Sequence, residues 1–309
     1  MISRAPCRFF CADVASGLPV GCDRARRPRR SVHEVGVVLA STFVKPIAEP
    51  HPLASAIQGG LNTLSNALSW AWLDTVCQYR RSRIGPLWET LNVLVMLLGL
   101  SVVSSAIFGS SVSDIIAYVG VGIIVWSAIS ALVIEGGGVF VRNAGYLSNS
   151  TLGLGLYVGR TVFKIMITFG HHAIIYLLGL VFALVPLSWT SLLAIPGIIL
   201  LFVNGFWVVM VLGFICARYR DVELIVRNLM QLAFFVTPVF WNYRQIASNR
   251  QFLVEYNVLF YFIEIIRNPL LGEIPPLAHY LTVLGVTVAG YGLAFVVYRR
   301  MRGQLAFCV

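Results

Sequence analysis

The chain has 309 residues, of which 58% are hydrophobic and 12% are charged, about half the charged fraction of an ordinary soluble domain. Its mean hydropathy is +0.81. This composition excludes a soluble globular enzyme and predicts an all-α integral membrane protein. The formal net charge of +10 is compatible with a nucleic-acid partner or with a basic cytoplasmic face, and the positions of the charges decide between the two.

Residues 1–60 differ from the rest of the chain. An arginine-rich run spans residues 24–30 among scattered prolines and glycines, and no apolar segment follows directly on a basic start, so a cleaved signal peptide fits poorly. We predict a basic, disordered cytoplasmic tail that touches anionic lipid headgroups. The six cysteines form no C-x-x-C pair and match no zinc spacing, so neither a disulfide nor a metal site is expected.

Residues 61–83 follow a helical pattern with basic residues at its end. The apolar positions that recur at steps of three and four residues are Leu61, Leu64, Leu68, Trp72 and Val76. This period predicts an amphipathic helix that lies in the membrane interface. It serves either as an anchor alone or as an anchor and a docking surface. Gly85 and Pro86 then break the helix before the first apolar run.

Six apolar runs follow, each near the length that crosses a bilayer. They span about 87–108, 115–134, 162–185, 191–217, 224–241 and 278–298. Residues 258–271 form a further apolar stretch that is short and carries Glu264 and Arg267. This stretch predicts a re-entrant periplasmic hairpin between the last two spans. Residues 61–309 are thus expected to form one six-span transmembrane domain.

The basic residues alternate with the spans. Twenty of the 23 Lys and Arg lie before the first span, after the second and fourth spans, or in the C-terminal tail. By the positive-inside rule, this distribution places both termini in the cytoplasm. An even number of crossings agrees with it. A nucleic-acid role does not require such alternation, and we exclude it.

No motif for catalysis or nucleotide binding is present. The sequence has no G-x-x-x-x-G-K-[ST], H-E-x-x-H or G-x-S-x-G pattern. His171 and His172 lie inside the third predicted span, where ionisable groups are often functional. Adjacent helical residues point about 100° apart, so both rings cannot easily bind one metal. We favour a hydrogen bond to a neighbouring helix over a substrate contact or a catalytic base, and expect no catalytic, cofactor or metal site.

Four segments carry a resemblance to a known family. They are Tyr79–Trp88, Ala217–Val222, Phe235–Trp241, and Tyr256-Asn257 with Ile266–Gly272. In this order they resemble the permease subunit of bacterial polysaccharide exporters of the ATP-binding-cassette class, which move O-antigen, capsule or teichoic-acid chains. The likeness runs from about residue 61 to the end of the chain.

The resemblance implies a homodimer in the bacterial inner membrane with a central channel for lipid-linked glycan. Two separate ATPase subunits would bind ATP and Mg²⁺. The ATPase interface would include Asp74, Tyr79, Arg80, Arg81, Asn143, Leu147, Arg218 and Asp221, with a coupling helix at residues 143–152. The channel or its gate would include Trp88, Asn92, Phe234, Phe235, Pro238 and Trp241. The chain departs from the family at 147–153, where relatives often carry a basic, proline-containing stretch.

Two alternative functions stay open. The same architecture can export a drug or a small lipid, and a membrane acyl or glycosyl transferase could use His171 or His172 as its base. Arg80, Arg81 and Arg83 could bind the lipid pyrophosphate of a glycan carrier, because cationic side chains pair well with phosphate. Membrane anchoring is the interpretation that we favour for these arginines.

Overall fold

A computed structural model describes residues 52–80, 82–109, 112–149, 153–182, 188–243 and 252–303. The chain separates into residues 1–50 and residues 51–309, and all described residues belong to the second unit. The predicted basic tail therefore lies almost wholly outside the described residues. Every regular element among those residues is a helix and none is a strand, so the all-α prediction is confirmed for this part of the chain.

The amphipathic helix, α1, spans Pro52–Tyr79. The helix begins and ends earlier in the chain than the predicted range of 61–83. The chain then turns at Gly85, whose φ of 67° is readily adopted only by glycine. The hydroxyl oxygen of Ser82 accepts a hydrogen bond from the Gly85 amide at 3.1 Å. Helix α2, Leu87–Phe108, follows at once, so the predicted break at Gly85 and Pro86 is confirmed.

Five described helices are long and apolar enough to cross a membrane. They are α2, α3 (Val112–Gly137), α6 (Leu154–Val181), α7 (Ala194–Arg218, which continues the 3-10 turn η1, Trp189–Leu193) and α11 (Leu277–Met301). They correspond to the first four predicted spans and the last one. Helix α6 starts well before the predicted residue 162, so Arg160 lies in a helix and not in the preceding loop.

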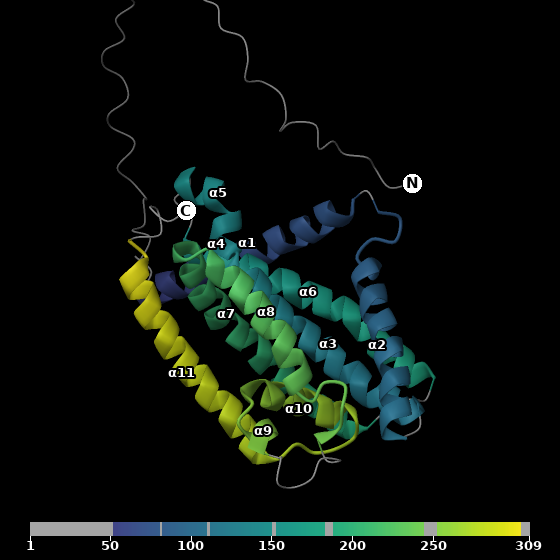
Figure 1. Cartoon of the computed structure of the whole chain (residues 1–309). Coiled ribbons are helices and arrows are strands. Elements are labelled where there is room, and N and C mark those ends of the chain that lie inside the picture. The colour runs from purple at the N-terminus through teal and green to yellow at the C-terminus, as the bar shows by residue number, and fades with distance from the viewer. Residues whose placement is uncertain are drawn as a thin grey trace, which may run out of the picture. The chain divides into compact units, whose positions relative to one another are not determined.

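The fifth predicted span is shorter in the structure. Helix α8, Asp221–Val236, has 16 residues and a length of about 24 Å, less than the roughly 30 Å of hydrocarbon. The count of six spans therefore stays a prediction. Two short helices follow, α9 (Phe252–Glu255) and α10 (Val258–Leu270), at the end of the bundle opposite α5 (Figure 1). Helix α10 occupies the segment predicted to re-enter the membrane, 258–271, and α9 precedes it. The re-entrant topology also stays a prediction.

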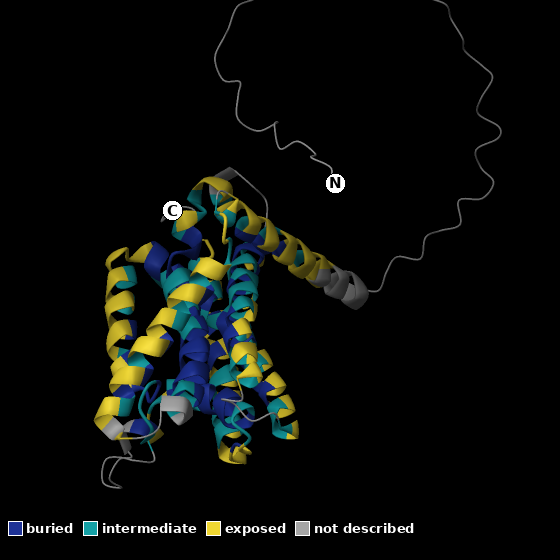
Figure 2. Ribbon diagram, turned by 90° about the vertical axis from the view of Figure 1, so that its right-hand side faces the viewer, coloured by how far each residue is buried: buried dark blue, intermediate teal, exposed yellow. Residues whose placement is uncertain are grey.

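Helix α3 lies at the centre of the packed helices. It is the most buried of the candidate spans, and it contacts α2, α6, α7, α8 and α10. Buried residues gather along this centre, while the outer faces of α1, α2, α8 and α11 are largely exposed (Figure 2). The exposed faces of α2 and α11 are mainly aliphatic and aromatic, as expected for helices whose solvent is lipid. Those of α1 and α8 mix apolar with polar side chains.

Helix α10 carries a buried ion pair. The side chains of Glu264 and Arg267 are fully buried, and Arg267 Nε donates to Glu264 Oε1 at 2.9 Å. Arg267 Nη1 donates to the Pro238 carbonyl at 2.8 Å, and the guanidinium lies 3.8 Å from the centre of the Tyr118 ring. A buried charge requires such partners. The arginine therefore joins α10 to α3 and to the segment that follows α8.

Candidate functional site

The connection between α3 and α6 forms two short helices. Helix α4, Val139–Arg142, packs its buried Phe140 against Phe214 of α7, with ring centres 5.0 Å apart. Helix α5, Ala144–Asn149, follows and extends away from the bundle (Figure 1), where Tyr146 is exposed. The connection is thus anchored at α4 and exposed at α5. It contains the start of the segment that the resemblance assigned to ATPase coupling.

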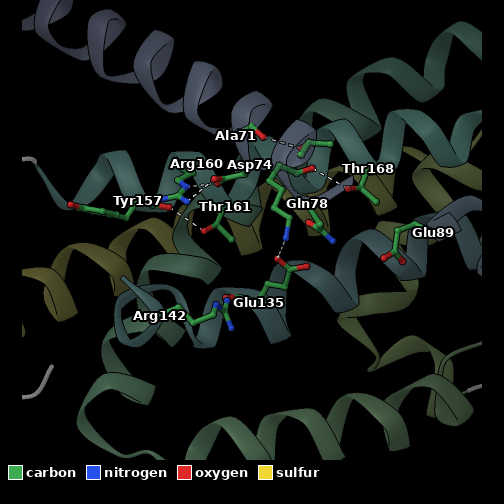
Figure 3. A network of polar contacts seen from close by, with 12 residues as sticks. Ala71, Asp74, Gln78, Glu89, Glu135, Arg142, Tyr157, Arg160, Thr161 and Thr168 are labelled. Carbon is green, nitrogen blue, oxygen red and sulfur yellow. Dashed lines mark hydrogen bonds and ion pairs between the residues drawn. The ribbon is translucent and has the colours of Figure 1, made fainter. Parts of the chain in front are cut away.

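Arg160 of α6 joins this connection to α1. Its Nη2 donates to Asp74 Oδ1 at 2.7 Å and its Nε donates to Oδ2, a two-point contact with one carboxylate (Figure 3). Its Nη1 donates to Asn143 Oδ1 at 3.2 Å, between α4 and α5. The guanidinium also lies 5.6 Å from the Trp70 ring centre. A bidentate contact between a guanidinium and a carboxylate fixes the relative orientation of the two side chains and also pairs their charges. The Arg160 side chain therefore links α6 to α1 and to the α4–α5 connection.

A second set of contacts ties α3 to α6 and α8. Lys164 Nζ lies 3.1 Å from Glu135 Oε2, near the end of α3. Arg142 lies beside Glu135 (Figure 3) and donates to its carbonyl. The Arg142 guanidinium also lies 4.0 Å from Glu223 of α8. Glu223 is also 3.6 Å from Arg227. The start of α8 is therefore linked electrostatically to the α3–α6 connection.

Tyr79, the last residue of α1, contacts α2 across the turn. Its hydroxyl donates to Glu89 Oε1 at 3.3 Å. Burial, followed by the charge of Glu89, the hydrogen bond and the charge of Glu135, raises the pKa of Tyr79 to about 12. The phenol therefore stays neutral and keeps donating at physiological pH.

The described residues predicted for the ATPase interface lie in or directly after the C-terminal part of α1, in the α4–α5 connection and at the turn between α7 and α8. The structure joins Asp74 and Asn143 through Arg160. Leu147 packs against the core, whereas Arg80, Arg218 and Asp221 are exposed. Arg81 lies outside the described residues. The sequence reasoning missed Arg160 as a site residue, because it counted that arginine only as one more basic charge near a span.

The residues predicted for the channel divide into two groups. Trp88 and Asn92 on α2 and Phe235 on α8 are exposed. Phe234 is buried, with its ring centre 5.6 Å from that of Trp126 on α3, and Pro238 is buried beside Arg267. The half-buried Trp241 donates its indole N–H to the Phe235 carbonyl at 3.1 Å. Only the first group is open to another molecule in this state.

The two histidines bond within the bundle. His172 Nδ1 lies 3.0 Å from the Ser127 hydroxyl oxygen on α3, which confirms the predicted bond to a neighbouring helix for this residue. His171 Nδ1 lies 2.8 Å from the Ile167 carbonyl of its own helix. Among the described residues, no group of three His, Cys, Asp or Glu side chains could hold a metal ion.

Comparison with known families agrees with this architecture. The model of the ABC-2 type transporter family matches residues 67–271, more than half of the chain. No curated protein matches the chain. The matched region contains the end of α1, the α4–α5 connection and the buried pair of α10. The chain belongs to the ABC-2 type transporter family and is a multi-pass transport permease, of the kind that works with an ATPase partner, and not a catalytic domain.

Proposed function

We propose that the protein is the membrane subunit of an ATP-driven exporter of lipid-linked polysaccharide in the bacterial inner membrane. Two copies would enclose the channel, and two separate ATPase subunits would bind ATP and Mg²⁺. Both termini would face the cytoplasm. The fifth of six crossings would be completed by α8 with the residues that follow it, and α10 would re-enter from the periplasmic side.

The contact between Arg160, Asp74 and Asn143 carries the proposal. A force applied to the exposed helix α5 reaches Asn143, and Arg160 connects Asn143 to both α1 and α6. Rigid elements joined by hydrogen bonds are the physical means of coupling distant sites. An ATPase docked on α5 would therefore move a candidate span and the interface helix together.

The exposed charges support the proposed orientation. Arg218 is the last residue of α7 and Arg220 lies two residues beyond it, and Arg299, Arg300 and Arg302 lie at the end of α11. All five are exposed, and the end of α11 lies at the same end of the bundle as α5 (Figure 1). A cytoplasmic assignment for this end follows the positive-inside rule.

A glycan substrate is supported by the family resemblance and by the exposed groups near the turn between α1 and α2. Arg80 and Arg83 are exposed there, and arginine pairs well with phosphate oxygens. Trp88 exposes an aromatic ring at the start of α2, and Phe235 exposes one at the end of α8, and both rings could stack on sugars. The first contact of a lipid-linked glycan would then be its pyrophosphate, held at the membrane interface.

An exporter of drugs or small lipids is the second candidate. The exposed face of α2 is mainly aliphatic, with Val95 and Val102 more than half exposed. On α8, Leu229 and Leu232 are more than half exposed beside exposed polar residues. Such faces suit an amphiphile as well as the lipid part of a glycan carrier. We do not carry the transferase alternative further, because the matching family is a transport family.

Co-purification from native membranes tests the assembly. We expect an ATPase with a Walker motif to be recovered in equal amount with this chain, and recovery of the chain without any ATPase would overturn the proposal. For the substrate, ATP hydrolysis by the reconstituted complex is compared with lipid-linked glycan and with a hydrophobic drug. Stimulation and transport of the glycan support the first candidate, whereas a response to the drug alone supports the second.

A further inference from the structure

A polar cavity of about 190 Å³ lies between α1, α2, α3 and α6. Its polar lining includes Tyr79, Glu89, Ser127, Glu135, Lys164 and His172. One water molecule requires roughly 10–15 Å³ of space measured in this way, so the cavity has room for a small organic group.

His172 presents a buried hydrogen-bond acceptor to this cavity. The Ser127 hydroxyl has one proton, which it donates to the Ile124 carbonyl at 2.7 Å. With the Ser127 proton donated to Ile124, the His172 tautomer that bonds to Ser127 across the 3.0 Å contact has its proton on Nδ1 and a lone pair on Nε2. The His172 side chain is only 5% exposed and its Nε2 has no partner. An unpaired buried acceptor is costly and calls for a donor.

The hydroxyl groups of the lining cannot supply that donor. Tyr79 donates to Glu89, Ser127 to Ile124, and Thr168 to the Lys164 carbonyl at 3.2 Å. Each hydroxyl has a single proton, so all three are committed elsewhere. The other donors of the lining are the N–H groups of Lys164 and Gln78. Lys164 is paired with Glu135 at 3.1 Å, and Gln78 Nε2 donates to the Tyr79 hydroxyl at 3.4 Å.

The charges of the lining point in the same direction. Glu135 is paired with Lys164 at 3.1 Å. Glu89 accepts from the neutral Tyr79 phenol, and no basic side chain in the described part of the chain lies within ion-pair distance of it. The lining carries two carboxylates and one ammonium, so one negative charge is left without a cation. The raised pKa of Tyr79, caused first by burial and then by Glu89 and Glu135, reports the same negative field.

We propose that this cavity binds a small primary ammonium group, supplied either by the headgroup of an aminolipid or by a soluble amine. A primary ammonium brings the missing positive charge and three N–H donors. A metal ion is a poorer match, because the described residues offer no cluster of metal-binding side chains. Val93 and Phe169, which also line the cavity, suit the carbon atoms beside the ammonium. The inference does not depend on which substrate is exported.

Binding is tested with the full chain in nanodiscs of phosphatidylglycerol, which contain no amine. Ethylammonium is titrated by equilibrium dialysis and compared with tetramethylammonium, which has the same charge but no N–H group. In a second arm, native mass spectrometry measures retention of phosphatidylethanolamine against phosphatidylcholine. We expect saturable binding of ethylammonium or selective retention of phosphatidylethanolamine, and the arm that responds identifies the source of the amine.

The variant Glu89→Gln removes the unpaired charge and keeps the shape of the side chain. We expect it to weaken amine binding about tenfold, the loss of one charge-assisted hydrogen bond. The matched control is Glu255→Gln, an exposed residue at the other end of the bundle, which should bind as the wild type does. Equal binding of ethylammonium and tetramethylammonium without lipid selectivity, or no binding in either arm, would overturn the proposal even if Glu89→Gln fails to fold.

Discussion

Arg160 donates hydrogen bonds to both carboxylate oxygens of Asp74, although the two residues are 86 positions apart in the chain. Their side chains are 22% and 32% exposed. The pair therefore fastens the interface helix α1 to the candidate span α6 at the boundary between bundle and solvent. Because Asn143 shares the same guanidinium, the strength of this pair governs how firmly the α4–α5 connection is held.

We predict that Asp74 and Arg160 are energetically coupled. A double-mutant cycle with Asp74→Asn and Arg160→Met should give a coupling free energy of about 1 kcal/mol, the upper end for partly exposed pairs, because the contact is bidentate. Reversible unfolding in mixed detergent and SDS micelles measures it. The exposed pair of Glu223 and Arg227 is the control, at about 0.3–0.5 kcal/mol. Strictly additive effects at Asp74 and Arg160 would contradict the structural assignment.

Substitution in the buried ion pair of α10 is expected to destabilise the protein more than substitution in the partly exposed pair of Asp74 and Arg160. Arg267→Met should lower the free energy of unfolding by about 3–5 kcal/mol, because it leaves the fully buried Glu264 carboxylate without its partner. The double variant Glu264→Leu/Arg267→Met should be less destabilised than Arg267→Met alone. The same SDS titration measures both. A double variant as unstable as the sum of the single variants would show that the two charges act separately.

Gly122 of α3 should not tolerate a side chain. A Cβ atom there would lie 2.7 Å from the Val239 carbonyl oxygen and 3.3 Å from Arg267 Nη1. Because the nearest atom is backbone, Gly122→Ala should cost about 1–3 kcal/mol through overpacking.

Gly120, on the same helix, is the matched control. A Cβ at that position meets only Leu97 at 3.4 Å, an ordinary contact. Gly120→Ala should be neutral or stabilising by up to about 1 kcal/mol, the helix-propensity difference. Thermal unfolding of the two variants compares them, and equal stability would argue against the packing of α3 on the segment after α8.

Tyr79 should contribute a pH-dependent term to stability in the alkaline range. Its pKa is raised to about 12 in the folded protein from an ordinary value of 10, so the unfolded chain releases the phenolic proton first. The contribution is fully present below pH 10 and is lost as the pH rises towards 12. Tyr79→Phe should therefore flatten the fall in stability over this window, as followed by unfolding titrations at several pH values.

The control for that experiment is Tyr146→Phe, which removes a tyrosine that is 62% exposed on α5. It should leave the pH dependence of stability as it is in the wild type. If both variants change the alkaline profile equally, the hydrogen bond between Tyr79 and Glu89 is not the cause.

The sequence predicted the helical segments well where length and hydrophobicity decide the outcome. The run at 87–108 became α2 with the predicted limits, since a glycine-proline break precedes it. The apolar run at 224–241 predicted the end of its helix less well, because α8 ends at Val236. Its apolar residues continue past the end of α8, because the segment turns at Thr237 and Pro238, where the Pro238 carbonyl meets Arg267. That contact depends on a residue far along the chain, which local composition does not reveal.

Some residues of the candidate site could be predicted from the sequence, but their contacts with one another could not. The resemblance pointed to Asp74 and Asn143 separately, but no periodicity in the sequence indicates that both contact Arg160. His172 was predicted to bond with a neighbouring helix, yet its partner, Ser127, and its unpaired Nε2 depend on how α3 packs against α6. Ionic and hydrogen-bonded partners across helices are set by packing, which hydropathy patterns do not encode.

The sequence by itself determined that lipid is the solvent of this protein, since its apolar runs and few charges are stable only in that medium. It also determined where the chain breaks at Gly85 and Pro86, because backbone conformation at those residues is a local property. Only the tertiary structure decided that Arg160 joins Asp74 to Asn143 and that Glu264 and Arg267 are buried together. These contacts arise when distant helices pack, and their energies depend on burial and geometry that only the assembled bundle supplies.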